Sequence, residues 1–318
     1  MKGTNDMRVF VAGATGAIGS PLVAALVRSG HEVTGTTRSA DRARRLEAAG
    51  ATPVVVDALD REAVKGAVAG AEPDVIVHEL TAIPAEFNPR RFDQAFAQTN
   101  RLRREGTEHL IAAAEAAGVH RFITQSFAAW AYARRGPWVK TEDEPLDDDP
   151  PAQVRRTLDG IRYLERATLE GPFKGIVLRY GWFYGPGSGV SRTGPIADAV
   201  RRRRFPIVAS GPGVWSFIHL VDAGEATALA VERGEPGVYN VTDDEPAAVR
   251  EWLPVFADAI GAPPPRHVPM WLGRVFGGEL SVTMMTKLRG ASNAKAKRGF
   301  DWKLRYPSWR LGFREDIG

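Results

Sequence analysis

The sequence of 318 residues contains no cysteine. This absence excludes disulfides, thiolate nucleophiles and cysteine-ligated metal sites. The sequence also lacks any run of about eighteen uncharged apolar residues, the length that a membrane-spanning helix needs. Its N-terminus has no basic stretch followed by an apolar core, which a secretory signal would show. These absences predict a protein of the cytoplasm that does not enter a membrane.

Charge of either sign is not in large excess, since the net charge is only +4. Nucleic-acid binding would need a basic stripe along one face. The one dense basic run, Arg201–Arg204, stands where a helix is expected to end, and cations there stabilise the helix dipole. A contact with an anionic substrate is the alternative for this run. Histidine, aspartate and glutamate do not occur with the spacing of a metal site. We therefore expect a small-molecule partner, without nucleic acid or metal.

Apolar, β-branched segments alternate with alanine-rich amphipathic segments through the first half of the chain. The strand-like segments are 9–12, 33–36, 52–56, 75–77, 121–124 and 175–178, and the helical ones include 21–28, 42–49, 61–68 and 92–117. Continuous apolar strands joined by helices are typical of a buried parallel sheet. The pattern predicts an α/β fold with a doubly wound parallel sheet of the Rossmann type.

After residue 178 this alternation weakens, and glycine and proline become frequent. Such a change indicates loops and short helices that cover the sheet. We expect a dinucleotide-binding Rossmann domain over 7–178, completed by about 216–242. A smaller C-terminal substrate-binding cap would then comprise 179–215 and 243–318.

A glycine-rich turn, Gly13-Ala-Thr-Gly16-Ala-Ile-Gly19, follows the first predicted strand and opens the first predicted helix. That context distinguishes a dinucleotide-binding turn from a chance glycine pattern. Gly13 permits the tight turn, Gly16 lets the backbone approach a pyrophosphate, and Gly19 lets the helix pack closely on the strand. The helix N-terminus then offers free amides and a partial positive charge to the phosphates.

The end of the second strand indicates which dinucleotide binds. Thr37 stands where an acid would hold the ribose 2′-hydroxyl of NAD, and Arg38 follows it. A threonine has no charge to repel a 2′-phosphate, and the planar guanidinium of an arginine suits phosphate. Arg42 lies one helical turn further on. NADP is therefore favoured over NAD, with an exposed arginine that binds nothing as the alternative for Arg38.

Several further segments resemble the extended short-chain dehydrogenase/reductase family, also called the NAD-dependent epimerase/dehydratase family. They are Asp57-Ala58, Thr99-Asn100, Leu178–Gly187, Phe217–Asp222, Val238–Val241 and Ser292–Lys295. The resemblance covers nearly the whole chain. Together with the turn and Arg38, it implies cofactor contacts at Gly13, Thr15, Gly16, Ala17, Ile18, Gly19, Asp57 and Ala58. Since members of the family are often dimers, we also consider a homodimer.

The resemblance breaks at the family's catalytic triad of serine or threonine, tyrosine and lysine. Ser126 aligns with the serine, and Glu165 aligns with a glutamate four residues after the lysine. This alignment places Thr157 at the tyrosine and Ile161 at the lysine. None of the six tyrosines of the chain is followed by a lysine four residues later. An isoleucine cannot supply the cation that lowers the pKa of the tyrosine. Since losing general acid/base help costs a factor of about 10²–10⁴, ordinary alcohol dehydrogenation is not expected.

Three other side chains are candidates for the missing proton donor. Tyr132 lies on the loop that is expected to face the nicotinamide, although packing is an alternative role. His78 and Glu79 end the fourth strand, where cofactor and substrate meet in doubly wound sheets. A histidine titrates near neutral pH, and a carboxylate beside it can act as a base. The alternative for His78 is a buried ring bonded to a backbone carbonyl.

Trp130, Tyr180 and Tyr184 are expected to line the substrate site, and Ser126 to polarise a substrate oxygen. The leading function is an NADP-dependent oxidoreductase or epimerase/isomerase with a non-standard proton donor, acting on a small organic or sugar-like molecule. Two alternatives remain open. One is a non-redox cyclase, lyase or dehydratase on the same fold. The other is a non-enzymatic NADP-binding sensor or scaffold.

Overall fold

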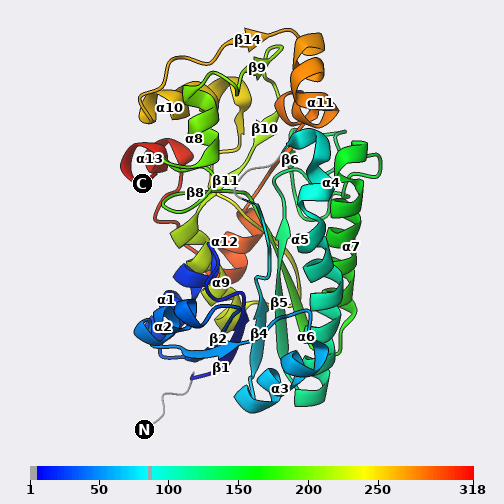
Figure 1. The fold of residues 1–318 in the computed structure, drawn as a ribbon, viewed down its shortest axis with the longest axis vertical. Helices are drawn as coiled ribbons and strands as arrows, with labels where there is room; N and C mark the ends of the chain where they lie inside the picture. The colour runs from blue at the N-terminus through cyan, green and yellow to red at the C-terminus, as the bar shows by residue number, and fades with distance from the viewer. Residues whose placement is uncertain (1–5, 85–87) are drawn as a thin grey trace.

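The computed structural model describes residues 6–84 and 88–318. A central sheet of seven parallel strands has the order β12-β7-β5-β4-β1-β2-β3 (Figure 1). Its strands are β1 (Arg8–Ala12), β2 (Glu32–Thr37), β3 (Thr52–Val55), β4 (Val75–His78), β5 (Arg121–Phe127), β7 (Lys174–Tyr180) and β12 (Gly237–Val241). The strand order reverses direction between β1 and β4. The predicted doubly wound parallel sheet is confirmed.

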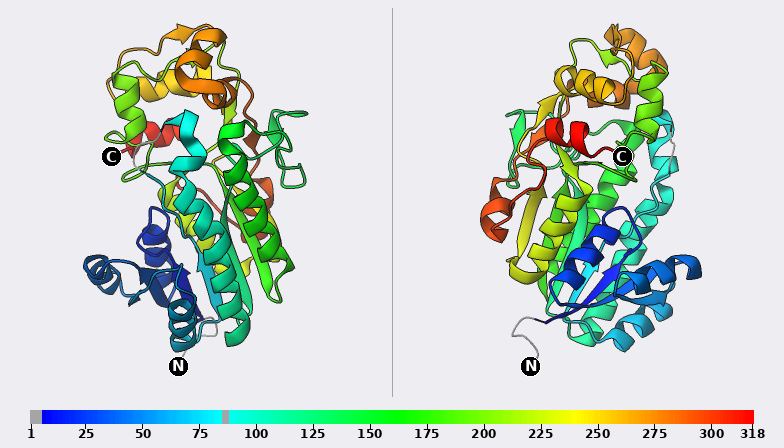
Figure 2. Two further views of the ribbon diagram at one scale, coloured as in Figure 1. Left: turned by 45° about the vertical axis from the view of Figure 1, so that its right-hand side comes forward. Right: turned by 90° about the vertical axis from the view of Figure 1, so that its left-hand side faces the viewer.

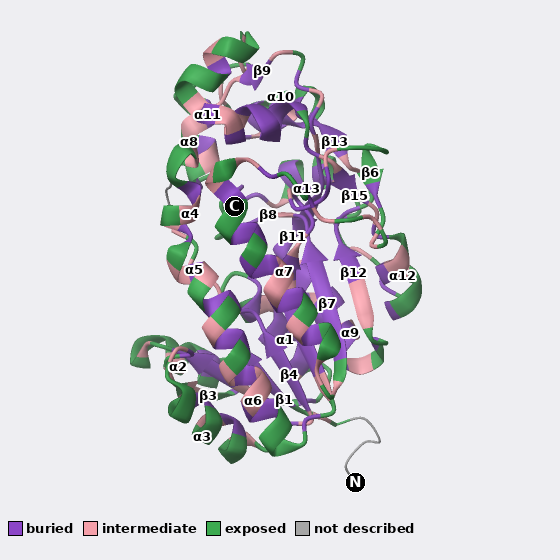
Figure 3. Cartoon of the chain, turned by 90° about the vertical axis from the view of Figure 1, so that its right-hand side faces the viewer, coloured by how far each residue is buried: buried purple, intermediate pink, exposed green. Residues whose placement is uncertain are grey.

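Helices cover both faces of this sheet because its strands are apolar on both sides. Val9 and Val11 belong to the core beneath α1 (Gly19–Arg28) and α9 (Leu220–Arg233). Phe10 belongs to the core beneath α3 (Arg61–Ala71) and α6 (Thr107–Ala117). Successive residues of a strand point to opposite faces, so one short strand serves both cores. Figure 3 shows the buried sheet between helices whose outer surfaces are exposed.

The remaining helices of this part are α2 (Ala40–Ala48), which packs beside β3, and α7 (Arg155–Glu170), which packs on β5 and β7. The single helix expected over 92–117 is divided instead. It consists of α4 (Phe92–Ala95), α5 (Ala97–Arg101), a π-helical turn η2 (Leu102–Gly106) and α6. A short helix η1 (Pro89–Arg91) precedes α4, and η3 (Ala152–Val154) precedes α7.

The cap lies over the carboxyl ends of the strands, at the end of the molecule opposite the N-terminus (Figure 2). Its helices are α8 (Pro195–Arg201), α10 (Val249–Ala259), α11 (Met270–Thr286) and α13 (Trp309–Glu315). The short strand pairs are β8 (Trp182–Tyr184) with β11 (Phe217–His219), β9 (Ile207–Val208) with β14 (His267–Val268), β10 (Val214–Trp215) with β13 (Ala247–Ala248), and β6 (Val139–Lys140) with β15 (Gly290–Ala291).

A second, aromatic-rich core holds the cap together, with Trp215, Trp252, Phe256 and Phe313 fully or almost fully buried. One segment of the range predicted for the cap, α12 (Ala294–Phe300), packs instead beside α9 and β12. Among the described residues, we find no helix long and apolar enough to cross a membrane.

Candidate active site

The glycine turn connects β1 to α1 at the carboxyl edge of the sheet. Its backbone lies so close to neighbouring backbone atoms that side chains at Gly13 and Gly19 would overlap them. Gly13 has φ +93°, and a Cβ on it would lie 2.8 Å from the carbonyl oxygen of Glu79. A Cβ on Gly19 would lie 2.2 Å from the carbonyl oxygen of Gly13. No side chain caps the start of α1. The amide of Ser20 donates to the carbonyl of Gly16, but the amides of Ala17, Ile18 and Gly19 have no backbone partner among the described residues. These amides are available to a diphosphate, and this arrangement fits the implied dinucleotide.

Replacing Gly19 with alanine is expected to cost about 1–3 kcal/mol of stability, because the added methyl group overlaps fixed backbone atoms. Displacement of the turn should also weaken NADPH binding. Gly66→Ala is the matched control, since Gly66 lies within α3 with nothing near the position of its Cβ. Thermal denaturation and NADPH titration of both variants measure the two effects. Equal stability and affinity in the two variants would contradict the close approach.

The residues predicted to select the dinucleotide lie around the end of β2. Thr37 is buried, and its hydroxyl lies 3.5 Å from that of Thr15. Arg38 and Arg42 are exposed, and no ion pair joins either guanidinium to another described residue. Both guanidinium groups are therefore accessible to the 2′-phosphate of a bound dinucleotide.

The other predicted cofactor contacts surround the same edge of the sheet. Ala17 is exposed on the turn, whereas Ile18 is buried. Asp57 is exposed and accepts a hydrogen bond from the amide of Leu59, while Ala58 is buried beside it. Which of these side chains touch a dinucleotide remains a prediction.

Ser126 belongs to a buried network of charges. Its hydroxyl donates to Glu165 Oε1 over 2.5 Å. Arg179 donates two hydrogen bonds to the same carboxylate, from Nε to Oε1 over 2.8 Å and from Nη2 to Oε2 over 2.6 Å. Burial opposes the charge of Arg179, but its bonds to Glu165 raise the pKa of the guanidinium above its usual value. The hydroxyl proton of Ser126 is therefore committed to the carboxyl group that Arg179 also binds.

Tyr132 joins this network from the other side of Arg179. Its hydroxyl donates to Asn240 Oδ1 over 2.7 Å and accepts from Arg179 Nη1 over 3.0 Å. The side chain is only 2% exposed, and burial raises the pKa of the phenol. The structure thus brings Ser126 and Tyr132 together, as two members of one interior hydrogen-bond network.

The two positions predicted to align with the family's tyrosine and lysine hold packed, fully buried side chains. Thr157 Oγ1 donates to Asp93 Oδ1 over 2.6 Å and accepts from Asn100 Nδ2 over 3.1 Å. The Asp93 carboxylate also accepts the backbone amides of Arg156 and Thr157, so it caps the first turn of α7. Ile161 packs in a small apolar cluster and has no exposed surface. The helix is intact, and neither position provides an ionisable group.

His78 is buried with both ring nitrogens bonded. Nδ1 accepts from the amide of Leu80 over 3.2 Å, which assigns the proton to Nε2. Nε2 then donates to Thr107 Oγ1 over 3.0 Å. Burial, reinforced by the nearby cation of Arg103, lowers the pKa of His78 to about 3. The ring is a neutral structural donor at physiological pH.

Glu79 does not pair with His78, because the two side chains leave opposite faces of the sheet. Glu79 Oε1 accepts a hydrogen bond from the hydroxyl of Tyr180 over 3.2 Å. Its other oxygen, Oε2, is buried without a partner among the described residues. Burial raises the pKa of Glu79 to about 8, so the carboxyl group is mostly protonated at pH 7.

Of the predicted substrate-binding residues, only Trp130 is partly exposed. Its ring centroid lies 6.0 Å from that of Phe127, and the Phe127 ring meets Trp182 edge-on at 5.5 Å. Tyr180 and Tyr184 have no exposed surface. Tyr184 lies in the cap core against Phe313. The half-buried aromatic group of Phe127, Trp130 and Trp182 therefore stands at the carboxyl edge, and sequence reasoning identified only Trp130.

Sequence reasoning also missed Arg103, a cation in the π-helical turn η2. Its side chain is only 8% exposed, and Nη1 has no hydrogen-bond partner among the described residues. Burial lowers its pKa to about 10. It packs beside Gly160, next to the position of the missing lysine. No motif marks this residue, although π-helical turns occur frequently at functional sites.

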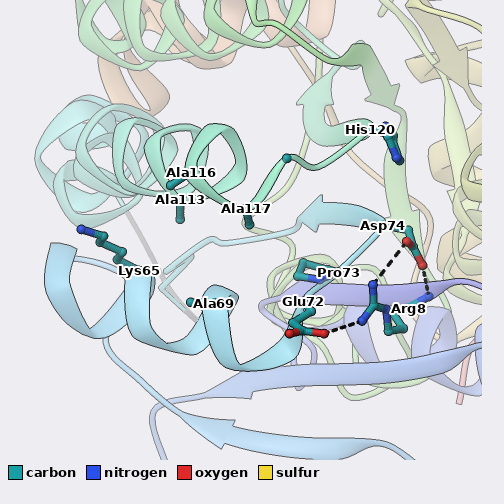
Figure 4. Close-up of a pocket in the computed structure, with 11 residues that line it drawn as sticks. Arg8, Lys65, Ala69, Glu72, Pro73, Asp74, Ala113, Ala116, Ala117 and His120 are labelled. Atoms are coloured by element: carbon teal, nitrogen blue, oxygen red, sulfur yellow. Dashed lines mark hydrogen bonds and ion pairs between the residues drawn. The ribbon is translucent and has the colours of Figure 1, made fainter.

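A hollow of about 610 Å³ lies at the opposite, amino edge of the sheet (Figure 4). Arg8, at the start of β1, forms ion pairs there with Glu72 and Asp74. None of the predicted site residues lines this hollow. We place the candidate site at the carboxyl edge because the glycine turn, Ser126 and the half-buried aromatic side chains are there. In the described part of the chain, no group of histidines and carboxylates could hold a metal ion.

Comparison with known proteins agrees with this geometry. Residues 9–242 match the family described as "NAD dependent epimerase/dehydratase family". A Streptomyces protein named 3-diazoavenalumate denitrifying reductase is 47% identical over 309 residues, covering 96% of this chain and 99% of the relative. A ketoreductase of Stigmatella aurantiaca that acts on a farnesylated dihydroquinoline oxide is 31% identical over 256 residues, covering 80% of this chain and 74% of the relative.

Solved structures show the same fold. UDP-glucose 4-epimerase from Thermus thermophilus, in complex with NAD, superposes with a TM-score of 0.73 at 24% identity, and 98% of each chain is covered. A human epimerase family protein with NADPH gives a TM-score of 0.73 at 21% identity, covering 98% of this chain and 99% of the other. Relatives with either dinucleotide therefore share this architecture.

Proposed function

Because the chain belongs to the NAD dependent epimerase/dehydratase family, we propose that it is an NADPH-dependent reductase of small organic molecules that works without the family's acid. What supports this proposal is that Thr157 and Ile161 stand, in an intact helix, at the positions that we align with the family's tyrosine and lysine. Thr157 is bonded to Asp93 and Ile161 is packed, so these two positions of α7 neither supply an acidic proton nor lower the pKa of a donor.

Without an acid in the site, we expect the substrate that accepts the hydride to be one whose reduction needs no proton. A ketone must gain a proton as well as a hydride, whereas a diazonium group leaves as neutral dinitrogen and its carbon needs only the hydride. When bound, NADPH supplies that hydride, and the reaction R–N₂⁺ + NADPH → R–H + N₂ + NADP⁺ balances in atoms and charge. The name of the Streptomyces relative describes a reductase that removes nitrogen from a diazo compound. We assign the same class of substrate to this chain.

The residues of this chain then bind and orient rather than transfer protons. The glycine turn, with the free amides of Ala17, Ile18 and Gly19 at the start of α1, holds the diphosphate. Arg38 and Arg42 hold the 2′-phosphate. Phe127, Trp130 and Trp182 offer aromatic faces to a flat substrate. In this proposal Ser126 and Tyr132 maintain the buried network around Arg179, and His78 stays neutral.

The proposed reaction is tested with NADPH deuterated at the transferred position and a panel of arenediazonium carboxylates and ketones. We expect dinitrogen release equal to NADPH consumed, with deuterium at the carbon that carried the nitrogen. Reactions without protein and with Gly19→Ala correct for spontaneous reduction.

Reduction of the ketones alone would overturn the assignment of the acceptor. That outcome would favour the second candidate, a ketoreductase like the Stigmatella relative, for which a proton donor would have to be present. Absence of both reactions together with failure to bind NADPH would overturn the reductase proposal itself.

A further inference from the structure

Glu79 stands immediately behind the dinucleotide turn. Its amide donates to the carbonyl of Ala12 over 2.9 Å, and its own carbonyl oxygen packs against Gly13. In a sheet of this type the dinucleotide crosses the carboxyl edge where the strand order reverses, which here is between β1 and β4. The residue that follows β4 therefore lies next to the path of the cofactor.

The carboxyl group of Glu79 is electrostatically isolated. It is 4% exposed, and its Oε2 has no hydrogen-bond partner in the part of the chain that the structure describes. From β7, Tyr180 donates to Oε1, and from α9, Thr227 bonds the same tyrosine hydroxyl over 2.6 Å. His78 turns away to Thr107, and Asp222 of α9 binds the backbone of the segment before α13.

No described arginine or lysine contributes to the pKa of Glu79, which burial raises to about 8. An ionised, unpaired carboxylate in such surroundings is unfavourable, so the group keeps its proton at neutral pH. A positive charge placed nearby would reverse this balance. The oxidised nicotinamide ring carries one positive charge, and the reduced ring carries none.

We propose that Glu79 is a redox-linked proton-binding residue of the dinucleotide site, protonated beside the reduced cofactor and ionised beside the oxidised one. The inference rests on the proposed nicotinamide chemistry. Its equilibrium is Glu79–COOH + NADP⁺ → Glu79–COO⁻·NADP⁺ + H⁺, and the proton passes to solvent. The carboxylate formed in this way stabilises the cationic ring, which favours hydride donation over its reversal.

The experiment compares proton release when NADP⁺ or NADPH binds, by calorimetric titration at pH 7 in two buffers of different ionisation enthalpy. Both dinucleotides carry the same phosphates, so the difference between them isolates the charge of the ring. Wild type should release up to one more proton with NADP⁺ than with NADPH. As the pH rises toward 8, its Kd for NADP⁺ should fall relative to its Kd for NADPH by up to tenfold per pH unit.

Glu79→Gln should bind both dinucleotides with no difference in proton release and with a pH-independent ratio of the two Kd values. Tyr180→Phe is the matched control, because it removes the bonded hydroxyl and keeps the carboxyl group, so its extra proton release should persist. The wild-type titration is sufficient if a variant does not fold. Equal proton release with both dinucleotides overturns this inference alone, whereas failure of both to bind overturns the proposed function as well.

Discussion

Replacing Glu165 with alanine should lower the free energy of unfolding by about 3–5 kcal/mol, because it leaves the buried guanidinium of Arg179 without its counter-charge. Both side chains are less than a tenth exposed, and two hydrogen bonds join them. The same substitution also removes the acceptor of the Ser126 hydroxyl. Urea denaturation followed by circular dichroism measures the loss.

Two variants separate the charge effect from simple loss of packing. Ser126→Ala removes one hydrogen bond to the same carboxylate and should cost less, about 1.5–3 kcal/mol. The double variant Glu165→Leu/Arg179→Met replaces the ion pair by apolar groups and should recover most of the stability lost in Glu165→Ala. If Glu165→Ala were no less stable than Ser126→Ala, the bidentate pair would not be a main stabilising contact.

The parts of the fold that could be predicted from the sequence are those whose signal lies in residues close together along the chain. The glycine turn shows its strand, its spacing and its helix within a single stretch of chain, and the apolar strands distinguish a parallel sheet. The helix expected over 92–117 looked continuous because its apolar positions recur along its whole length. At η2, Arg103 packs against Gly160 of α7, a long-range contact that helical periodicity does not show.

The candidate site was harder to predict because its contacts join residues far apart in sequence. Tyr132 was expected on a loop near the nicotinamide, but its hydroxyl binds Asn240, more than a hundred residues away. Thr157 takes its role from Asp93 on α4. A sequence shows that a tyrosine or a threonine is present, whereas its partner and its burial decide whether it can titrate.

The free energy of unfolding should fall as the pH rises from about 6.5 to about 8, and we expect the ionisation of Glu79 to be the main cause. Its pKa is about 8 in the folded protein and about 4.5 when unfolded, so the unfolded state releases its proton first. The stabilising contribution of the protonated side chain is complete below pH 4.5 and is lost as the pH approaches 8. His78 acts in the opposite direction, since its folded pKa of about 3 lies below the ordinary 6.5. Its contribution is complete above pH 6.5 and is lost on acidification.

Between about pH 4.5 and 6.5 the two slopes oppose each other, which predicts a plateau of stability. Above pH 6.5 only the Glu79 slope continues, and at about 1.4 kcal/mol per pH unit it removes about 2 kcal/mol by pH 8. Burial raises the pKa values of Asp222 and Asp243 too, so the informative quantity is the difference between wild type and Glu79→Gln. The variant should gain stability relative to wild type throughout this alkaline range. Urea denaturation at half-unit steps from pH 5 to pH 8.5 measures the difference, and parallel curves for the two proteins would show that Glu79 is already ionised in the folded state.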